Sequence, residues 1–218
     1  MSRIIVFGGH GRIALLLAPL LAARGDEVTG VIRNPEHSSE VEAGGARALV
    51  ADVESMDVDA LAEIIRGHDA VVWSAGAGGG SPERTYAVDR DAAQRSVDAA
   101  ERAGVRRYVM VSWLGSTADH GVPRDDSFFP YADAKWAADE HLRGTGLEGT
   151  ILAPGTLTFD DPTGRIQIDP EGRGAVSRAD VAAVIAASLQ EPCTVGRTIR
   201  FGNGDADSAV PITDALSC

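Results

Sequence analysis

The chain has 218 residues, of which 44% are hydrophobic, and its 32 acidic residues outnumber 20 basic ones to give a formal net charge of -12. This length suits one compact domain and leaves little room for two catalytic domains. The average field of such a chain repels nucleic acids and anionic membranes, so an anionic ligand must be captured locally, by a helix N-terminus or a well-placed arginine.

The sequence also bears on the compartment in which the protein works. The N-terminus does not resemble a leader, and no apolar run approaches the roughly 20 residues that cross a bilayer, so we expect a soluble, cytoplasmic protein. Cys193 and Cys218 lie far apart in the chain and form no metal-like or redox-like pair, which fits a reducing compartment. No metal site is predicted.

The first half of the chain alternates between predicted strands and helices. Short apolar runs predict strands at 3–7, 27–32, 48–51 and 69–74. Helix formers, apolar spacing or start signals predict helices at 12–23, 57–66 and 81–103. Pro19 is the one flaw in the first helix, and the glycines that follow the three helices are placed to stop them: Gly25, Gly67 and Gly104.

The alternation continues through the second half. Apolar runs predict strands at 105–112, 150–153 and 198–201. Helices are predicted at 131–142 and 181–189, the latter after a Ser177-to-Asp180 segment that resembles a capping box. Two irregular stretches, 113–130 and 156–176, follow the carboxyl ends of strands, where parallel sheets bind ligands.

This order of elements predicts the fold class. Strands that alternate with helices, without a long polar linker, indicate an α/β protein with a Rossmann-type doubly wound parallel sheet covered on both faces. We expect a single domain over 1–218, with its core at 1–155 and a small C-terminal region on the substrate side. The two irregular stretches are expected to be substrate-side loops.

The first strand passes into the first helix through a glycine-rich turn with the spacing GxxGxxA, which ends at Ala14. Gly8 permits a tight turn, Gly11 lets a pyrophosphate approach the backbone, and the helix N-terminus supplies amides and partial positive charge. The alternative is a turn that binds nothing, and the position of the turn in the sheet weakens it. The predicted cofactor-binding residues of the turn are Gly8, Gly9, His10, Gly11, Arg12 and Ile13.

The ends of the next strands carry further candidates for cofactor binding. Arg33 stands where an acidic residue would bind the ribose of NAD, and arginine suits a 2′-phosphate, so NADP(H) is preferred over NAD(H). Arg12 could share that phosphate, and a plain surface role for Arg33 is the alternative. Asp52 and Val53 suit the adenine, unless Asp52 only caps a helix. Small residues after the fourth strand let the cofactor cross the sheet edge: Ser74, Ala75 and Gly76.

Together these motifs resemble the short-chain dehydrogenase/reductase superfamily, specifically its atypical members with an NAD(P)H-binding, NmrA-like domain. The resemblance extends over nearly the whole chain, and the small reductases that act on flavins or biliverdin belong to the same broad group. Besides the residues above, it rests on RAGVRRYVMVS, YADAK, SRADVA and the segment Ala153-Pro154-Gly155-Thr156. His10 departs from the family pattern, in which threonine is frequent, and is expected to face the phosphates or to pack.

The resemblance implies a catalytic set of Ser112, Tyr131 and Lys135. Residues four apart share a helix face, so Lys135 can lie near Tyr131, lower its pKa and reach the nicotinamide ribose. Tyr131 would then donate a proton to a carbonyl oxygen that Ser112 holds by a hydrogen bond. The alternative is a Tyr131 that only packs and a Lys135 that is a solvated cation. Three residues match the segment at the nicotinamide end: Pro154, Gly155 and Thr156.

The sequence thus predicts an NADPH-dependent oxidoreductase that transfers hydride to a small carbonyl, quinone or flavin-like acceptor. The alternatives are a non-catalytic NADP(H)-binding sensor and, ranked lower because few residues follow Ala153, a sugar-nucleotide epimerase or dehydratase. The expected partners are a small-molecule substrate and a second copy in a homodimer, with neither nucleic acid nor membrane. Four apolar residues form either a lid over a flat substrate or part of the core or an interface: Trp113, Leu114, Phe128 and Phe129.

Overall fold

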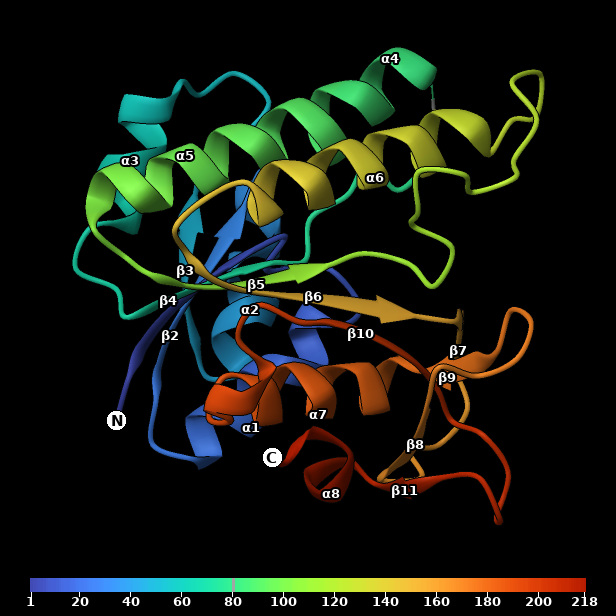
Figure 1. Ribbon diagram of the computed structural model, residues 1–218. Helices are drawn as coiled ribbons and strands as arrows, with labels where there is room; N and C mark the ends of the chain where they lie inside the picture. The colour runs from blue at the N-terminus through green and yellow to red at the C-terminus, as the bar shows by residue number, and fades with distance from the viewer. Residues whose placement is uncertain (80) are drawn as a thin grey trace.

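A mixed β-sheet forms the centre of the computed structural model, which describes residues 1–79 and 81–218 (Figure 1). Its parallel strands are β1 (Arg3–Phe7), β2 (Glu27–Ile32), β3 (Ala46–Val50), β4 (Ala70–Trp73), β5 (Arg107–Val111), β6 (Glu148–Pro154) and β10 (Thr198–Gly202). Two antiparallel strands, β8 (Arg165–Ile168) and β11 (Val210–Pro211), extend one edge. The order is β11-β8-β10-β6-β5-β4-β1-β2-β3, and β7 (Thr156–Thr158) pairs separately with β9 (Ala175–Ser177).

Helices cover both faces of this sheet (Figure 1). One face carries α3 (Val58–Ile65), α4 (Pro82–Thr85), α5 (Ala93–Ala103) and α6 (Phe129–Arg143), with a π-helical turn, η2 (Tyr86–Ala92), between α4 and α5. The other face carries α1 (Ala14–Ala23), α2 (Ser38–Ala43), α7 (Arg178–Ser188) and α8 (Ile212–Leu216). Short 3-10 turns are η1 (Pro35–His37) and η3 (Pro192–Thr194). No helix in the described residues is long and apolar enough to cross a membrane.

The core is divided by the sheet into two apolar clusters, because successive side chains of a strand point to opposite faces. Ile4 and Val6 of β1 pack with Leu17 of α1 in one cluster, whereas Ile5 and Phe7 belong to the other. A strand that is buried on both faces reads as a continuous apolar run, which is how the sequence shows it. The predicted α/β, doubly wound Rossmann-type fold is therefore confirmed.

Three local predictions need correction. The stretch 156–176 is not wholly irregular, because it contains β7 and β8 and leads into β9, and the sheet is antiparallel at this edge. The predicted helix at 81–103 contains the π-helical turn η2. The short polar helix α2 was not predicted, since SSEVEA carries no apolar period. Gly80, the last glycine of the run after β4, lies outside the described residues.

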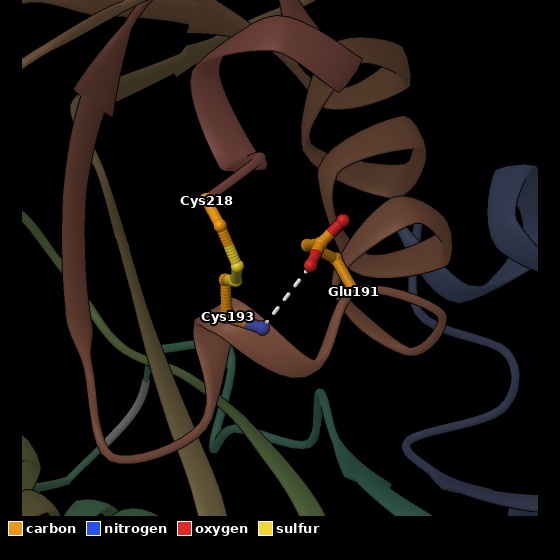
Figure 2. Close-up of side chains that lie close together, drawn as sticks. All are labelled: Glu191, Cys193 and Cys218. Carbon is orange, nitrogen blue, oxygen red and sulfur yellow. Dashed lines mark hydrogen bonds between the residues drawn. A yellow bond between two sulfur atoms is a disulfide. The ribbon is translucent and has the colours of Figure 1, made fainter.

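The expectation that Cys193 and Cys218 form no metal-like or redox-like pair needs correction. The two residues form a disulfide, with their Cα atoms 5.5 Å apart (Figure 2). Their separation of 25 residues in the chain hides this contact, which arises because α8 folds back against α7. Glu191 lies beside them and accepts a hydrogen bond from the Cys193 amide at 3.1 Å. The disulfide ties the end of the chain to η3.

Removing this disulfide should destabilise the oxidised protein. A cross-link over a loop of this size lowers the conformational entropy of the unfolded chain, which stabilises the folded state by about 3 kcal/mol. Cys193→Ser should therefore lower the free energy of unfolding by about that amount. Urea unfolding without reductant measures the difference, and the same experiment in excess dithiothreitol is the control, because both proteins then lack the bond. A free thiol at both positions in air-oxidised wild-type protein would contradict the pairing.

Candidate functional site

A cleft of about 940 Å³ opens at the carboxyl ends of the parallel strands. It is lined by the loops after β1, β2, β3 and β4, by the end of β5 and by α6. The predicted site residues that line it are Gly8, His10, Gly11, Ile13, Arg33, Asp52, Val53, Ser74, Ala75, Gly76, Ser112, Tyr131 and Lys135. Those outside its lining are Gly9, Arg12, Pro154, Gly155 and Thr156. One concave surface thus gathers residues from six segments of the chain.

The glycine-rich turn fits a dinucleotide. Gly8 has a φ of +79°, and a Cβ there would lie 2.7 Å from the Cα of Ala75, so only glycine suits this position. No side chain of the described residues caps α1, and its first turn holds no acidic residue, which leaves the helix N-terminus for an anion. Gly9 has a packing reason instead, because a Cβ there would meet the Cα of Gly30 at 2.7 Å.

His10 lies in this turn with its ring held on both sides. Its Nε2 lies 2.7 Å from Oε2 of Glu40, and its ring stacks on His37 with centroids 3.6 Å apart. His10 and His37 both line the cleft. Sequence reasoning did not single out His37 or Glu40, since neither belongs to a motif.

Beyond the carboxyl ends of β2 and β3, two arginines share one carboxylate. Arg33 Nη1 lies 2.8 Å from Oε1 of Glu54, and Arg84 Nη2 lies 3.2 Å from the same atom. Asp52 accepts a hydrogen bond from the Glu54 amide, while α3 is capped by Asp57, so Asp52 shapes a turn and does not cap the helix. Arg84 and Glu54 were missed, because a charged residue in a loop carries no signal of its own.

Lys135 is the only lysine of the chain and is buried, with 2% of its surface exposed. Its Nζ donates a hydrogen bond to the carbonyl oxygen of Val111 at 2.5 Å. Two buried carboxyl groups, Asp89 and Asp139, interact with its charge, which lowers their pKa values against the stronger opposing effect of burial. The alternative of a solvated cation at this position is therefore wrong.

Asp89 comes from the π-helical turn η2 and lines the cleft. Its Oδ2 accepts a hydrogen bond from the Ala77 amide at 2.9 Å, and a Cβ on Gly76 would lie 3.0 Å from its Oδ1. Burial raises the pKa of this carboxyl, partly opposed by the charge of Lys135. No motif singles out this aspartate, which lies in the middle of a predicted helical segment.

Tyr131 faces the cleft from α6, one turn before Lys135. Burial raises the pKa of its phenol, and the charges of Asp89 and Asp139 raise it further. The expectation that Lys135 lowers this pKa is therefore corrected. The Lys135 ammonium donates its hydrogen bond to Val111, and the charges that act on the phenol are those of the two carboxylates. At neutral pH the phenol is protonated and is a proton donor.

Ser112 makes a different hydrogen bond from the one the sequence predicts. Its Oγ donates to Oδ2 of Asp139 at 2.5 Å, and Ser116 donates to the same oxygen at 2.5 Å. Asp139 is fully buried, and its Oδ1 has no partner among the described residues. Because the Ser112 hydroxyl already donates its hydrogen to Asp139, its oxygen can only accept a hydrogen bond from a ligand in the cleft. The sequence predicts that Ser112 donates one.

The segment after β6 is held by backbone pairing. The Gly155 amide donates to Phe201 and the Thr156 amide to Gly174, so neither is free for a carboxamide, and Leu157 lines the cleft in their place. The apolar residues of the stretch 113–130 fall into two groups, one at the cleft and one in the core. Phe128 lines the cleft and meets the Trp113 ring at 5.1 Å. Leu114 belongs to the core.

The buried Asp139 predicts a pH dependence of stability. Because burial raises its pKa above the ordinary 3.8, the folded protein holds this proton to higher pH than the unfolded chain does. The free energy of unfolding should therefore fall as pH rises from 3.8 through the raised pKa, and Asp139→Asn should remove that part of the fall. Urea unfolding across pH measures it, with the exposed Asp125→Asn as control; identical pH slopes in wild type and Asp139→Asn would contradict it.

Several known proteins are similar to this chain in sequence and in fold. The profile of a family described as NAD(P)H-binding matches residues 8–192. The chain is 34% identical to a protein of Bacillus subtilis named as an uncharacterized sugar epimerase, YhfK, over 98% of both chains. It is similar to the structure of a Bacillus halodurans protein whose name proposes an NAD-dependent epimerase/dehydratase, with 31% identity, a TM-score of 0.90 and 99% of each chain covered. The oxidoreductase ylbE of Lactococcus lactis is 27% identical, with a TM-score of 0.86, over 98% of this chain and 94% of that one.

Proposed function

Because the chain belongs to the NAD(P)H-binding family of atypical short-chain dehydrogenases/reductases, we propose that it is an NADPH-dependent oxidoreductase acting on a small carbonyl, quinone or flavin-like acceptor. The observation that carries this proposal is the placing of Tyr131 and Lys135 in the same cleft as the glycine-rich turn. A protein that only binds a dinucleotide has no need of a half-buried phenol and a buried ammonium in that cleft.

The dinucleotide, when bound, supplies hydride from its nicotinamide ring. With a carbonyl acceptor, an electron pair moves onto the acceptor oxygen as hydride reaches the carbon, and Tyr131 gives that oxygen a proton. The tyrosinate is reprotonated from solvent. Lys135 supplies a buried positive charge that partly offsets the carboxylates of Asp89 and Asp139, whose charges act on Tyr131.

The electrostatics of Tyr131 favour reduction over the reverse reaction. A phenol with a raised pKa keeps its proton at neutral pH, so it serves as an acid, while oxidation of an alcohol needs a base in the same place. Phe128, 42% exposed and in edge contact with Trp113, supplies an apolar surface beside the cleft that suits a flat acceptor.

The preference for NADP(H) rests on Arg33. A guanidinium binds a 2′-phosphate in bidentate fashion, so Arg33→Ala should raise the Kd for NADPH by about tenfold, while the Kd for NADH changes by less than about twofold. Fluorescence titration of the reduced cofactors measures both constants. The exposed Arg66→Ala is the control for loss of one positive charge. Equal weakening of both cofactors, or of neither, would remove this assignment.

Sugar epimerisation is a second candidate, favoured by the names of two similar proteins. An epimerase removes hydride from an alcohol carbon and returns it, so it consumes no NADPH. The protonated Tyr131 weighs against the required base, and β7, β8, β9, β11 and α8 leave little structure to hold a sugar nucleotide.

A panel of acceptors separates these functions. NADPH absorbance is followed in the presence of quinones, flavins and aldehydes. In a separate assay, a set of nucleotide sugars is tested for conversion to their epimers. We expect NADPH to be consumed in the presence of at least one acceptor. Sugar conversion without NADPH consumption would support epimerisation, and tight NADPH binding without either reaction would support an NADP(H)-binding sensor.

A further inference from the structure

An exposed aromatic ring at the rim of the cleft carries two arginines. Phe159 follows β7 and is 75% exposed, the largest exposure of any aromatic ring among the described hydrophobic side chains. The guanidinium carbon of Arg178 lies 4.1 Å from the ring centroid, and that of Arg12 lies 4.9 Å from it. Gly11 and Leu157, close to Arg12 and Phe159 in the chain, line the cleft. The cluster therefore borders the cleft.

The two guanidinium groups are not neutralised by the protein. In the described part of the chain, neither forms an ion pair with a carboxylate, although Asp160 and Asp161 directly follow Phe159. Arg178 donates one hydrogen bond, from Nη1 to the carbonyl oxygen of Thr158 at 2.8 Å. Burial lowers the pKa of Arg178, and the charge of Arg12 lowers it further. Two like charges thus share one ring in a chain of net charge -12.

The backbone adds to this positive potential. Arg12 directly precedes the N-cap residue of α1, and Arg178 is the first residue of α7. These two helices pack against each other on one face of the sheet (Figure 1). A helix N-terminus carries partial positive charge, so a cation there is unfavourable without an anion. Asp180, the acidic residue of the first turn of α7, is occupied by hydrogen bonds from Thr163, Gly164 and Asn203.

We propose that Arg12, Arg178 and Phe159 form a binding site for a phosphate or carboxylate group at the rim of the cleft. Arginine binds such oxyanions in a planar, bidentate manner, and stacking on Phe159 holds both guanidinium planes in place for it. Two sources have this chemistry: the diphosphate of the cofactor, whose predicted turn includes Arg12, and an acidic group of the acceptor. The second source rests on the proposed function and would make the acceptor an anion.

Binding measurements on matched variants test this site. Arg178→Met and the double variant with Arg12→Met keep the aliphatic stem against Phe159 and remove the charge. Arg197→Met is the control, because it removes the same charge from an exposed residue that precedes β10, at the amino ends of the strands. Kd values are measured by fluorescence for NADPH, riboflavin and riboflavin 5′-phosphate, and by competition for inorganic pyrophosphate.

A rise of about tenfold in the Kd for NADPH and pyrophosphate, with both flavins equally affected, supports the cofactor as the source. A similar rise for riboflavin 5′-phosphate alone, with riboflavin unchanged, supports an anionic acceptor. Unchanged constants for NADPH, pyrophosphate and the flavin phosphate in the double variant, or equal changes in Arg197→Met, would overturn the site. Because every readout is binding, absence of turnover would count against the proposed function and not against this site.

Discussion

Replacing Tyr131 by phenylalanine is expected to lower the rate of NADPH oxidation by about 10²- to 10⁴-fold, the contribution of a positioned proton donor. The Kd for NADPH should stay within about twofold of wild type, since a phenol that donates to the acceptor oxygen adds little to cofactor affinity. The physical reason is the raised pKa of Tyr131, which keeps a proton available in a cleft where Ser112 has turned its own proton to Asp139.

The matched control is Tyr86→Phe. Tyr86 lies near the same helix and donates to Asp133 at 2.9 Å, but it does not line the cleft, so its loss should leave turnover nearly unchanged. Stopped-flow absorbance with the best acceptor of the panel measures both variants. Wild-type turnover in Tyr131→Phe would show that another group protonates the acceptor.

Replacing Lys135 by methionine is expected to destabilise the protein by about 3 to 5 kcal/mol as well as to abolish turnover. Methionine fills a similar volume, so the loss comes from charge: Asp89 and Asp139, which both interact with the Lys135 charge, would be left buried without that cation. A buried carboxylate without a cation must either take up a proton or be exposed to water by unfolding. The loss of stability in Lys135→Met should therefore be largest at alkaline pH, where protonation is least favourable.

A second variant separates this charge effect from ordinary repacking. In the background of Lys135→Met, changing Asp139 to asparagine removes one of the two unpaired carboxylates and should restore part of the stability. Urea unfolding of the single and double variants at neutral pH measures the coupling. Additive losses, or a loss below about 1 kcal/mol in Lys135→Met, would mean that the three groups do not form one charge cluster.

The parts of the fold that the sequence predicts are those with local signals. Strands β1 to β5 are apolar runs, each followed by a helix, and the turn from Gly8 to Ile13 shows its spacing directly. Ser177 illustrates the same point, because its side chain accepts a hydrogen bond from the Asp180 amide as the motif indicated. Local chemistry is therefore enough for the parallel part of the sheet, several helix ends and the place of the cleft.

The parts that were missed depend on contacts between distant segments. The disulfide joins residues 25 apart, and β8 is a four-residue strand whose pairing with β10 no local pattern reveals. The same holds in the cleft, where Asp139 sets the direction of the Ser112 proton from another element. Motifs located the reacting side chains, but the state of their protons follows from buried neighbours that no motif includes.

The most direct test of the proposed reaction follows the hydride itself. NADPH that carries deuterium at the transferable position of its nicotinamide ring is mixed with the enzyme and each aldehyde of the panel, because the hydride then becomes a C–H bond that does not exchange with water, and the product is analysed by mass spectrometry. We expect the product to gain one deuterium in wild type and almost none in Tyr131→Phe. Tight binding of the labelled cofactor, with no deuterium in any aldehyde product and no oxidation of NADPH by a quinone or flavin, would contradict the assignment of an oxidoreductase.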